Sequence, residues 1–264
     1  MTYVVSFCSS RGGTGKTTIA TNFAFSLALS GVDTVAIDMD FRAPSFFHVF
    51  KNSAGKPAKQ YVNEFLDSRC QPQDVFFDLG DKFGTKGKLL IGSADPSISA
   101  IEEMSAKSRN WEAKALRNLF HLKKSLERDL NNPIIIYDNG PGVHYSSLNA
   151  IVSSDTVVFV STPDSLDLQG LANLFKEYED LFEDKAKIVL NKVFPDREQW
   201  SKHTKDRFMN RLPEILRKLV IAVIPCYCDF LDPEKQILVS SEHPLNTELA
   251  EIAGQLGLAN ARLG

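Results

Sequence analysis

The sequence predicts an α/β protein in which one mostly parallel, doubly wound sheet carries helices on both faces. Two observations lead to this prediction. Short, unbroken apolar runs recur along the chain, and segments with helical spacing of apolar residues separate most of them. Strands that are buried on both faces have such runs, and parallel strands need helical crossovers between them. The length of 264 residues suits one unit, so we expect residues 1–264 to form a single domain.

The elements of the N-terminal half follow from this pattern. Residues 2–8, 34–38 and 88–93 are short and apolar, and each predicts a buried strand. Apolar residues recur at helical spacing from 20 to 28, which predicts a helix between the first two strands. Residues 51–87 are the least regular part of the chain, and we expect them to form an insertion that decorates the same domain.

The C-terminal half repeats the alternation of apolar runs with helical spacing. Strands are expected at 133–138, 156–161, 186–190 and 219–224. Helices are expected at about 110–130, 166–181, 207–218 and 246–258.

Composition excludes several classes of protein. A hydrophobic fraction of 43% and a charged fraction of 24% are typical of soluble globular chains and exclude fibrous repeats. The net charge of −3 argues against a nucleic-acid surface over the whole chain, although a local basic patch stays open. Four cysteines are too few for a secreted disulfide scaffold, and no apolar run reaches the ~18 residues that cross a bilayer. We therefore expect a cytoplasmic protein.

A glycine-rich loop with a lysine stands between the first predicted strand and the first predicted helix. Glycines let consecutive backbone N–H groups turn inward around phosphate oxygens, and the helix N-terminus adds partial positive charge. We expect Lys16 to bridge the β- and γ-phosphates of a nucleotide and the Thr17 hydroxyl to ligate Mg²⁺. The alternative is an ordinary turn that happens to contain Lys-Thr. Nucleotide contacts are predicted for Arg11, Gly12, Gly13, Thr14, Gly15, Lys16, Thr17 and Thr18.

Ser10 stands where the general phosphate-loop pattern has a glycine, and a narrower motif accounts for the departure. Residues 11–18, Arg-Gly-Gly-Thr-Gly-Lys-Thr-Thr, resemble the deviant Walker A motif K-G-G-x-G-K-T-T of the ParA/MinD ATPases. Residues 38–45 resemble the switch I of that family, D-x-D-x-x-x-P-S. Residues 138–142 resemble its Walker B and switch II segment, D-T-x-P-G.

Two later segments extend the resemblance toward the C-terminus. Residues 189–193 are similar to the strand that ends in the adenine-reading Asn of the family, and 223–225 to the strand whose Pro lies against the base. The resemblance therefore implies base contacts from Asn191 and Pro225; an amide offers both a donor and an acceptor to the adenine edge. The five motifs keep the order of the family and cover residues 4–226.

This resemblance implies a P-loop ATPase that uses ATP and Mg²⁺ and forms a homodimer around two nucleotides. Slow hydrolysis, stimulated by an adaptor that the sequence does not identify, would switch the dimer between partners and so partition or position a cargo. In the family the first Lys of the loop motif reaches across the interface, and here Arg11 holds that position. A guanidinium is planar and longer than an ammonium, so the exchange is not neutral. Asn139 and Gly140 also depart from the switch II pattern.

Phosphoryl transfer to water needs charge neutralisation and an in-line nucleophile. We assign the first to Lys16, aided by Arg11, and the orientation of the attacking water to Asp40. We expect Asp38 to hold the hydration shell of the Mg²⁺ ion and Asp138 to bind one of its waters, because Mg²⁺ takes few direct protein ligands. The alternative for Asp38 and Asp40 is a pair of acids in a solvated turn after a strand.

Other interpretations stay open. The chain can be a nucleotide-binding scaffold that hydrolyses little, or a metal or iron–sulfur carrier that uses Cys226 and Cys228, although a lone C-x-C is a weak metal site. Residues 38–45 also resemble the second Walker motif of bacterial tyrosine kinases, but the chain does not end in a tyrosine cluster.

Partners are the least specified part of the prediction. Seven Lys and Arg between 197 and 218 would allow non-specific DNA binding, while a solvated charged face is the alternative. The final helix carries acids at Glu248 and Glu251, which argues against a membrane-binding tail. Arg42 lies within the segment that resembles switch I, where a contact with phosphate or a partner, or a pair with a surface acid, would fit. His144 follows the segment that resembles switch II, where either coupling to a partner or a structural role would fit.

Overall fold

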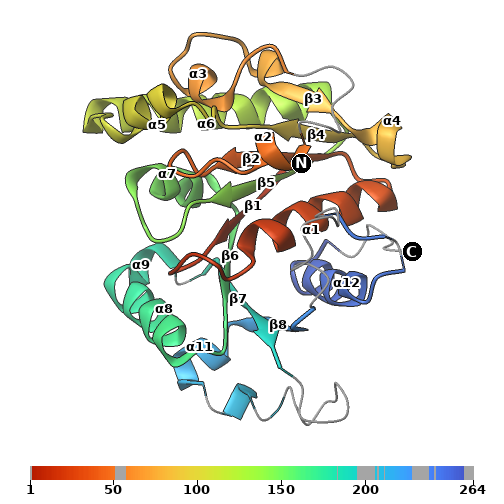
Figure 1. Ribbon diagram of the computed structural model, residues 1–264, viewed down its shortest axis with the longest axis vertical. Coiled ribbons are helices and arrows are strands. Elements are labelled where there is room, and N and C mark those ends of the chain that lie inside the picture. Colours follow the sequence, from red (N-terminus) through yellow and green to blue (C-terminus); the bar gives the residue numbers. More distant parts are fainter. Residues whose placement is uncertain are drawn as a thin grey trace.

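The computed structural model describes residues 2–50, 58–182, 184–194, 206, 208–210, 212–227, 238–240 and 242–258. Within them, eight strands belong to one sheet (Figure 1). The strands are β1 (Tyr3–Cys8), β2 (Thr34–Met39), β3 (Phe76–Asp78), β4 (Leu89–Gly92), β5 (Ile134–Asn139), β6 (Thr156–Ser161), β7 (Ala186–Val193) and β8 (Val220–Pro225). The helices are α1 (Lys16–Ser30), α2 (Phe46–Phe50), α3 (Val62–Leu66), α4 (Gly80–Phe83), α5 (Ile98–Ser105), α6 (Arg109–Asp129), α7 (Tyr145–Ser153), α8 (Ser165–Glu177), α9 (Glu179–Phe182), α11 (Glu214–Arg217) and α12 (Leu245–Gln255), with a 3₁₀ turn, η1, at Pro72–Val75.

The order across the sheet is β3-β4-β2-β5-β1-β6-β7-β8. Every neighbouring pair is parallel except β3 and β4, which are antiparallel. This arrangement confirms the predicted fold class, a mostly parallel, doubly wound sheet. Because the chain leaves β1 toward β2 on one side and leaves β6 toward β7 on the other, β1 and β6 meet at a topological switch point, where such sheets bind ligands.

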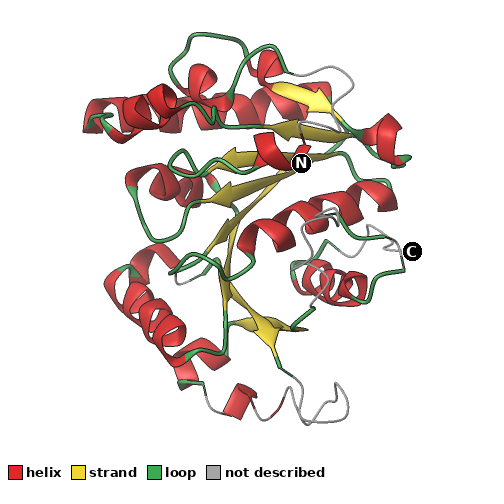
Figure 2. Cartoon of the chain, in the orientation of Figure 1, coloured by secondary structure: helices red, strands yellow, loops and turns green. Residues whose placement is uncertain are grey.

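Helices cover both faces of the sheet, as Figures 1 and 2 show. Alternate residues of β5 illustrate the period of two: Ile134 and Ile136 pack in the cluster with α1 and α12, whereas Ile135 and Tyr137 pack with α6. A third cluster joins β6, β7 and β8 to α8, α9 and α11. Burial of both faces explains why the strands are continuous apolar runs.

The irregular segment adds a strand that the sequence pattern did not predict. Its described part contains α3, η1, β3 and α4, and β3 extends the sheet beyond β4 as the antiparallel edge. A strand of three residues is too short to display a period of two, so alternation could not reveal it.

Two of the predicted helices were wrong in extent. The helix expected at 166–181 is divided into α8 and α9 at Tyr178; Glu179 and Asp180 favour a new N-terminus, where acids are stabilised by the helix dipole. The helix expected at 207–218 is interrupted before α11, because Pro213 has no N–H to donate inside a helix. Residues 207 and 211 lie outside the described part of the chain. No described helix has both the length and the apolar character that crossing a bilayer requires.

Candidate nucleotide-binding site

The carboxyl ends of β1, β2 and β5 bring the predicted site residues to one edge of the sheet. The loop after β1 runs directly into α1, so the amide N–H groups of the first turn of the helix point toward this edge. Gly13 and Gly15 have φ angles of 82° and 87°, in the left-handed region that favours glycine. Gly15 is also the N-cap of α1. The two glycines thus allow the loop to close over the helix N-terminus.

Lys16 and Thr17 converge on one carboxylate at the end of β5. Lys16 Nζ lies 2.6 Å from Asp138 Oδ1, and the Thr17 hydroxyl donates to Asp138 Oδ2 at 2.6 Å. The Lys16–Asp138 ion pair is buried. Burial alone would lower the pKa of the Lys16 ammonium, but the charge and hydrogen bond of Asp138 outweigh it and raise that pKa. Lys16 therefore keeps its positive charge at this edge of the sheet.

Asp38 lies beside Asp138 because the two residues are register partners on β2 and β5. It is fully buried and accepts hydrogen bonds from the backbone N–H groups of Asp40, Ser45 and Phe46. Burial, followed by the negative charge of Asp138, raises the pKa of Asp38 to about 7. Asp38 thus fixes the start of the segment that resembles switch I.

These groups fit a magnesium ion. With Asp38 and Asp138 both ionised, two buried carboxylates share the single positive charge of Lys16, so the cluster has net negative charge. Its carboxylate and hydroxyl oxygens are the kind of ligand that Mg²⁺ prefers. Among the described residues, no group of three or more His, Cys, Asp or Glu could enclose a metal ion. Mg²⁺ needs no such cage, because it is usually bound through one or two carboxylates together with waters and substrate phosphates.

Asp40 follows β2 and faces the loop after β5. Its Oδ1 accepts from the N–H groups of Arg42 and Ala43, at 3.2 and 3.0 Å. A Cβ at Gly140 would lie 2.9 Å from Asp40 Oδ1, so the glycine permits the close approach. Oδ2 of Asp40 has no hydrogen-bond partner in the described part of the chain and is the oxygen that could hold a water.

A separate cavity of about 170 Å³ adjoins the loop at Gly15. Asn191 and Pro225 line it together with Gly15 and Thr18, so the structure brings the two predicted base-binding residues to the phosphate loop. The Asn191 side chain donates to the Thr14 carbonyl at 2.8 Å. Sequence reasoning missed that Lys192 Nζ donates to the Gly13 carbonyl at 2.7 Å. Two residues near the end of β7 therefore fix the backbone of the loop.

Arg11 is exposed and forms an ion pair with Asp164 at 3.4 Å. The same Asp164 carboxylate caps the N-terminus of α8 by accepting from Leu166 and Asp167. Next to it, Ser10 Oγ donates to the buried Asp167 Oδ1 at 2.6 Å. Sequence reasoning predicted a role for neither aspartate; a signal was available in the N-cap pattern that opens α8, but that pattern does not indicate contact with residues 10 and 11.

The remaining residues singled out from the sequence, Asn139 and the cysteines, lie outside the cluster around Asp138. Asn139 is buried, and its amide donates to the Phe7 carbonyl at 3.0 Å. Burial raises the pKa of the Cys8 thiol to about 12, consistent with a core position. Cys226 is a free, half-buried thiol, and Cys228 lies outside the described residues, so the metal-carrier hypothesis stays a prediction.

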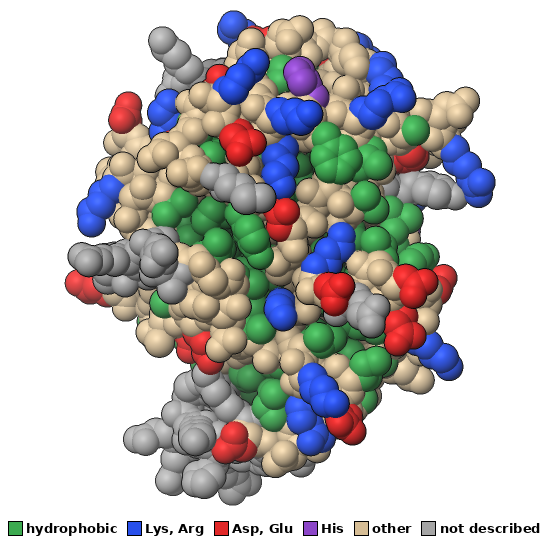
Figure 3. All heavy atoms as spheres, turned by 180° about the vertical axis from the view of Figure 1, so that it is seen from behind, with side chains coloured by type: hydrophobic (Ala, Val, Ile, Leu, Met, Phe, Trp, Pro, Cys, Tyr) green, Lys and Arg blue, Asp and Glu red, His purple; other side chains and the backbone are tan. Residues whose placement is uncertain are grey.

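Most of the basic stretch between 197 and 218 also lies outside the described residues. Within the described part, Lys218 forms an ion pair with Glu214 at 2.9 Å, and Arg217 donates to the Asn210 and Leu212 carbonyls. On the face shown in Figure 3, the described Lys and Arg side chains are interspersed with Asp and Glu. DNA binding remains an open prediction.

The chain is similar in sequence and in fold to several known proteins. The family model described as the CobQ/CobB/MinD/ParA nucleotide binding domain matches residues 5–226. An uncharacterised protein of Methanocaldococcus jannaschii is 28% identical over 226 residues, which are 84% of each chain. The cell division protein PomZ of Myxococcus xanthus is 25% identical over 71% of this chain and 54% of its own length. The solved structure of the septum site-determining protein MinD of Pyrococcus horikoshii with Mg-ADP has a TM-score of 0.71 at 17% identity, covering 100% of this chain and 99% of MinD, a likeness of fold.

Proposed function

Because the chain belongs to the CobQ/CobB/MinD/ParA nucleotide-binding family, we propose that it is a Mg²⁺-dependent ATPase that dimerises around nucleotide and switches between partners. Its cellular role would be the partitioning or positioning of a cargo, as the septum site-determining and cell division names of its relatives suggest. The observation that carries the proposal is the buried cluster of Lys16, Thr17 and Asp138 at the N-terminus of α1, beside Asp38.

The loop after β1 and the cavity beside it would divide the nucleotide between them. Backbone N–H groups of the loop, the α1 N-terminus and the Lys16 ammonium would hold the triphosphate. Lys16 can do so while it donates to Asp138, because an ammonium has three donors. The base would enter the cavity lined by Asn191 and Pro225, where the Asn191 amide offers hydrogen bonds to an adenine edge.

Hydrolysis would depend on charge neutralisation and on the position of one water. A bound Mg²⁺ supplies positive charge to the phosphate oxygens, and Thr17, Asp38 and Asp138 are the residues that would hold it and its waters. Asp40 would accept a hydrogen bond from the attacking water at Oδ2, while its Oδ1 stays fixed by the N–H groups of Arg42 and Ala43. With only this orienting group, slow turnover that an adaptor accelerates is expected.

Dimer formation would place Arg11 against the nucleotide of the partner. The Arg11–Asp164 pair joins two exposed side chains, so breaking it costs less than about 1 kcal/mol. A guanidinium released from Asp164 could then bind phosphate bidentately.

Phosphate release and ATP binding by the wild type, Lys16→Ala and Asp40→Ala test the proposal. We expect Lys16→Ala to lose nucleotide binding, and Asp40→Ala to keep binding and lose turnover, with an ATP-dependent dimer visible by sedimentation. Background turnover in all three proteins, with ATP bound by the wild type, would leave the scaffold alternative. No binding of ATP by the wild type would refute the proposal altogether.

A further inference from the structure

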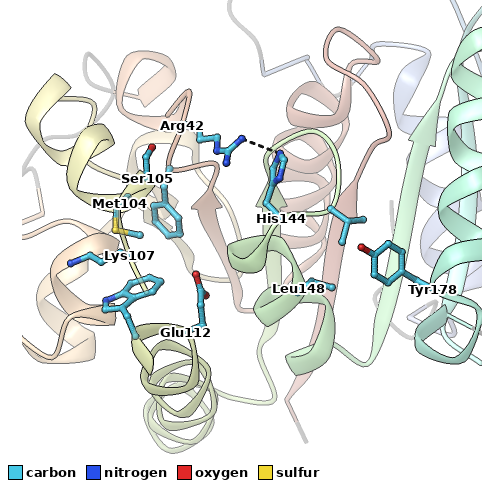
Figure 4. Close-up of a pocket in the computed structure, with 11 residues that line it drawn as sticks. Arg42, Met104, Ser105, Lys107, Glu112, His144, Leu148 and Tyr178 are labelled. Carbon is cyan, nitrogen blue, oxygen red and sulfur yellow. Dashed lines mark hydrogen bonds between the residues drawn. The ribbon is translucent and has the colours of Figure 1, made fainter. Parts of the chain in front are cut away.

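A second pocket opens beside the segments that resemble the two switches (Figure 4). It has a volume of about 360 Å³, within the range of pockets that bind small ligands or single side chains of a partner. Arg42 comes from the loop after β2 and His144 from the loop after β5, while Met104 and Trp111 come from α5 and α6. Leu148 of α7 also lines the pocket, on the same side of it as His144 in this view.

The apolar wall of the pocket is held in place from behind. Trp111 donates its indole N–H to Asp67, and Lys107 Nζ lies 5.5 Å from the centre of the indole ring. Lys107 is itself neutralised by Asp67 at 2.9 Å and by Glu103 at 2.8 Å. The tryptophan ring is therefore a fixed surface, and Lys107 adds no uncompensated charge to the pocket.

Arg42 is the cation of this pocket that has no counter-charge. It forms no ion pair within the described residues, and its one side-chain contact there is Nη1 to His144 Nε2 at 3.2 Å. Arginine can only donate, so Nε2 of His144 accepts and the imidazole is neutral. Glu112 also lines the pocket; its carboxylate accepts from the neutral Asn149 amide at 2.8 Å and forms no ion pair among the described residues, so only the Arg42 end of the pocket offers positive charge. An exposed guanidinium above an aromatic and aliphatic wall is thus complementary to an acidic group joined to an apolar one.

We propose that this pocket binds an acidic, extended segment of a partner protein, which inserts an aromatic or long aliphatic side chain against Trp111 and presents a carboxylate to Arg42. The inference deepens the proposed function, since it names the chemistry of the adaptor. Arg42 follows Asp40 by two residues, and His144 lies in the loop that begins after Asn139, next to Asp138. The pocket therefore shares its loops with the proposed nucleotide site. If ATP and ADP hold these loops differently, the pocket differs between the two states, and the partner's peptide binds the two states with different affinity.

Random decapeptides displayed on phage test this directly against the full chain with Mg-ATP. Enriched sequences are expected to combine Asp or Glu with an aromatic or long aliphatic residue. Their synthetic peptides are then titrated by the fluorescence of Trp111 in a Trp200→Phe background, which leaves Trp111 as the sole tryptophan. Arg42→Glu and Met104→Asp should each weaken binding at least about tenfold, equivalent to 1.4 kcal/mol.

Lys124→Glu is the matched control, because it makes the same charge change on an exposed residue of α6 that does not line the pocket. It should leave peptide affinity unchanged. Exchange of ADP for ATP should change the affinity by about fivefold or more. Enriched peptides without acids, equal binding by Arg42→Glu and wild type, or equal affinity in the two nucleotide states would overturn the inference.

The fluorescent analogue mant-ATP, titrated into the same samples, separates this inference from the proposed function. If the wild type binds the analogue but no peptide is enriched over the Arg42→Glu control, the docking pocket is refuted and the ATPase proposal stands. If the wild type binds no nucleotide, the ATPase proposal fails whatever the peptides do. Thermal unfolding of Arg42→Glu and Met104→Asp confirms that each variant is folded; weakened binding by both folded variants then supports the pocket.

Discussion

Three glycines of the loop after β1 provide a graded test of its geometry, because alanine at each would meet a different obstacle. At Gly12 an added Cβ has nothing within 4 Å, and no left-handed φ is involved. At Gly13 the space is equally open, but φ is 82°. At Gly15 φ is 87°, and the Cβ would overlap Asn191 Nδ2. Alanine thus meets no obstacle at Gly12, backbone strain alone at Gly13, and backbone strain together with a steric clash at Gly15.

The expected free energies of unfolding follow from these differences. Gly12→Ala should be neutral or stabilising by about 0.4–1 kcal/mol, since it reduces only the freedom of the unfolded chain. Gly13→Ala should cost about 1–2 kcal/mol for a left-handed alanine. Gly15→Ala adds the loss of the 2.8 Å hydrogen bond from Asn191 to the Thr14 carbonyl, worth about 1 kcal/mol, for a total of about 2–3 kcal/mol.

Thermal unfolding without added nucleotide measures the series. At about 2–4 °C per kcal/mol for a chain of this size, Gly15→Ala should lower Tm by about 4–12 °C and Gly13→Ala by about 2–8 °C. Adding Asn191→Ala to Gly15→Ala removes the clash, so the double variant should lose less than the sum of the two single effects. Equal Tm values across the three glycine variants, or full additivity with Asn191→Ala, would refute this account of the loop.

Three further predictions concern the charged groups at the same edge of the sheet. Asp138→Asn leaves the Lys16 ammonium buried without its carboxylate and should cost about 3–5 kcal/mol in urea unfolding, against no more than about 1 kcal/mol for Asp164→Asn at the exposed Arg11 pair; similar losses in both variants would contradict the reasoning. The pKa of Asp38 is raised from 3.8 to about 7, so the native state holds this proton more tightly and stability falls as pH rises between those values. The decrease from pH 5 to pH 7 is about 2 kcal/mol, and it should be absent in Asp38→Asn; parallel pH profiles of the two proteins would exclude the assignment. Partial burial and then the charge of Arg42 lower the pKa of His144 below 6.5, so an NMR titration should find its midpoint below that value. As pH falls through the midpoint, the imidazolium can no longer accept the hydrogen bond from Arg42, which should break; a midpoint above 6.5 would contradict this pairing.

Local patterns were sufficient to predict the strand–loop–helix at the start of the chain and the fold class. The run from Tyr3 to Cys8 is mostly apolar, and the spacing of glycines and Lys16 is specific, so neither required knowledge of distant residues. The joint role given to Lys16, Asp38 and Asp138 rested on the resemblance to the ParA/MinD motifs. The structure explains why they lie together: the carboxyl ends of parallel strands meet at one edge of the sheet. The pattern did not predict β3, which is too short, or the helices α2, α5 and α7. It also did not predict the breaks in two helices, which depend on Tyr178 and Pro213.

The interactions that escaped prediction join the loop to residues about 150 positions away. Ser10 departs from the general phosphate-loop pattern, and its hydroxyl donates to Asp167; Arg11 replaces a lysine, and its guanidinium pairs with Asp164. Both residues that depart from the motif therefore contact acidic residues at the N-terminus of α8. Asp167 is buried and also accepts from the Thr162 N–H at 2.6 Å, so this segment is a fixed support for the loop. Substitutions at 10 or 11 should accordingly act through α8 as well as through the nucleotide, a coupling that no reading of the loop motif alone contains.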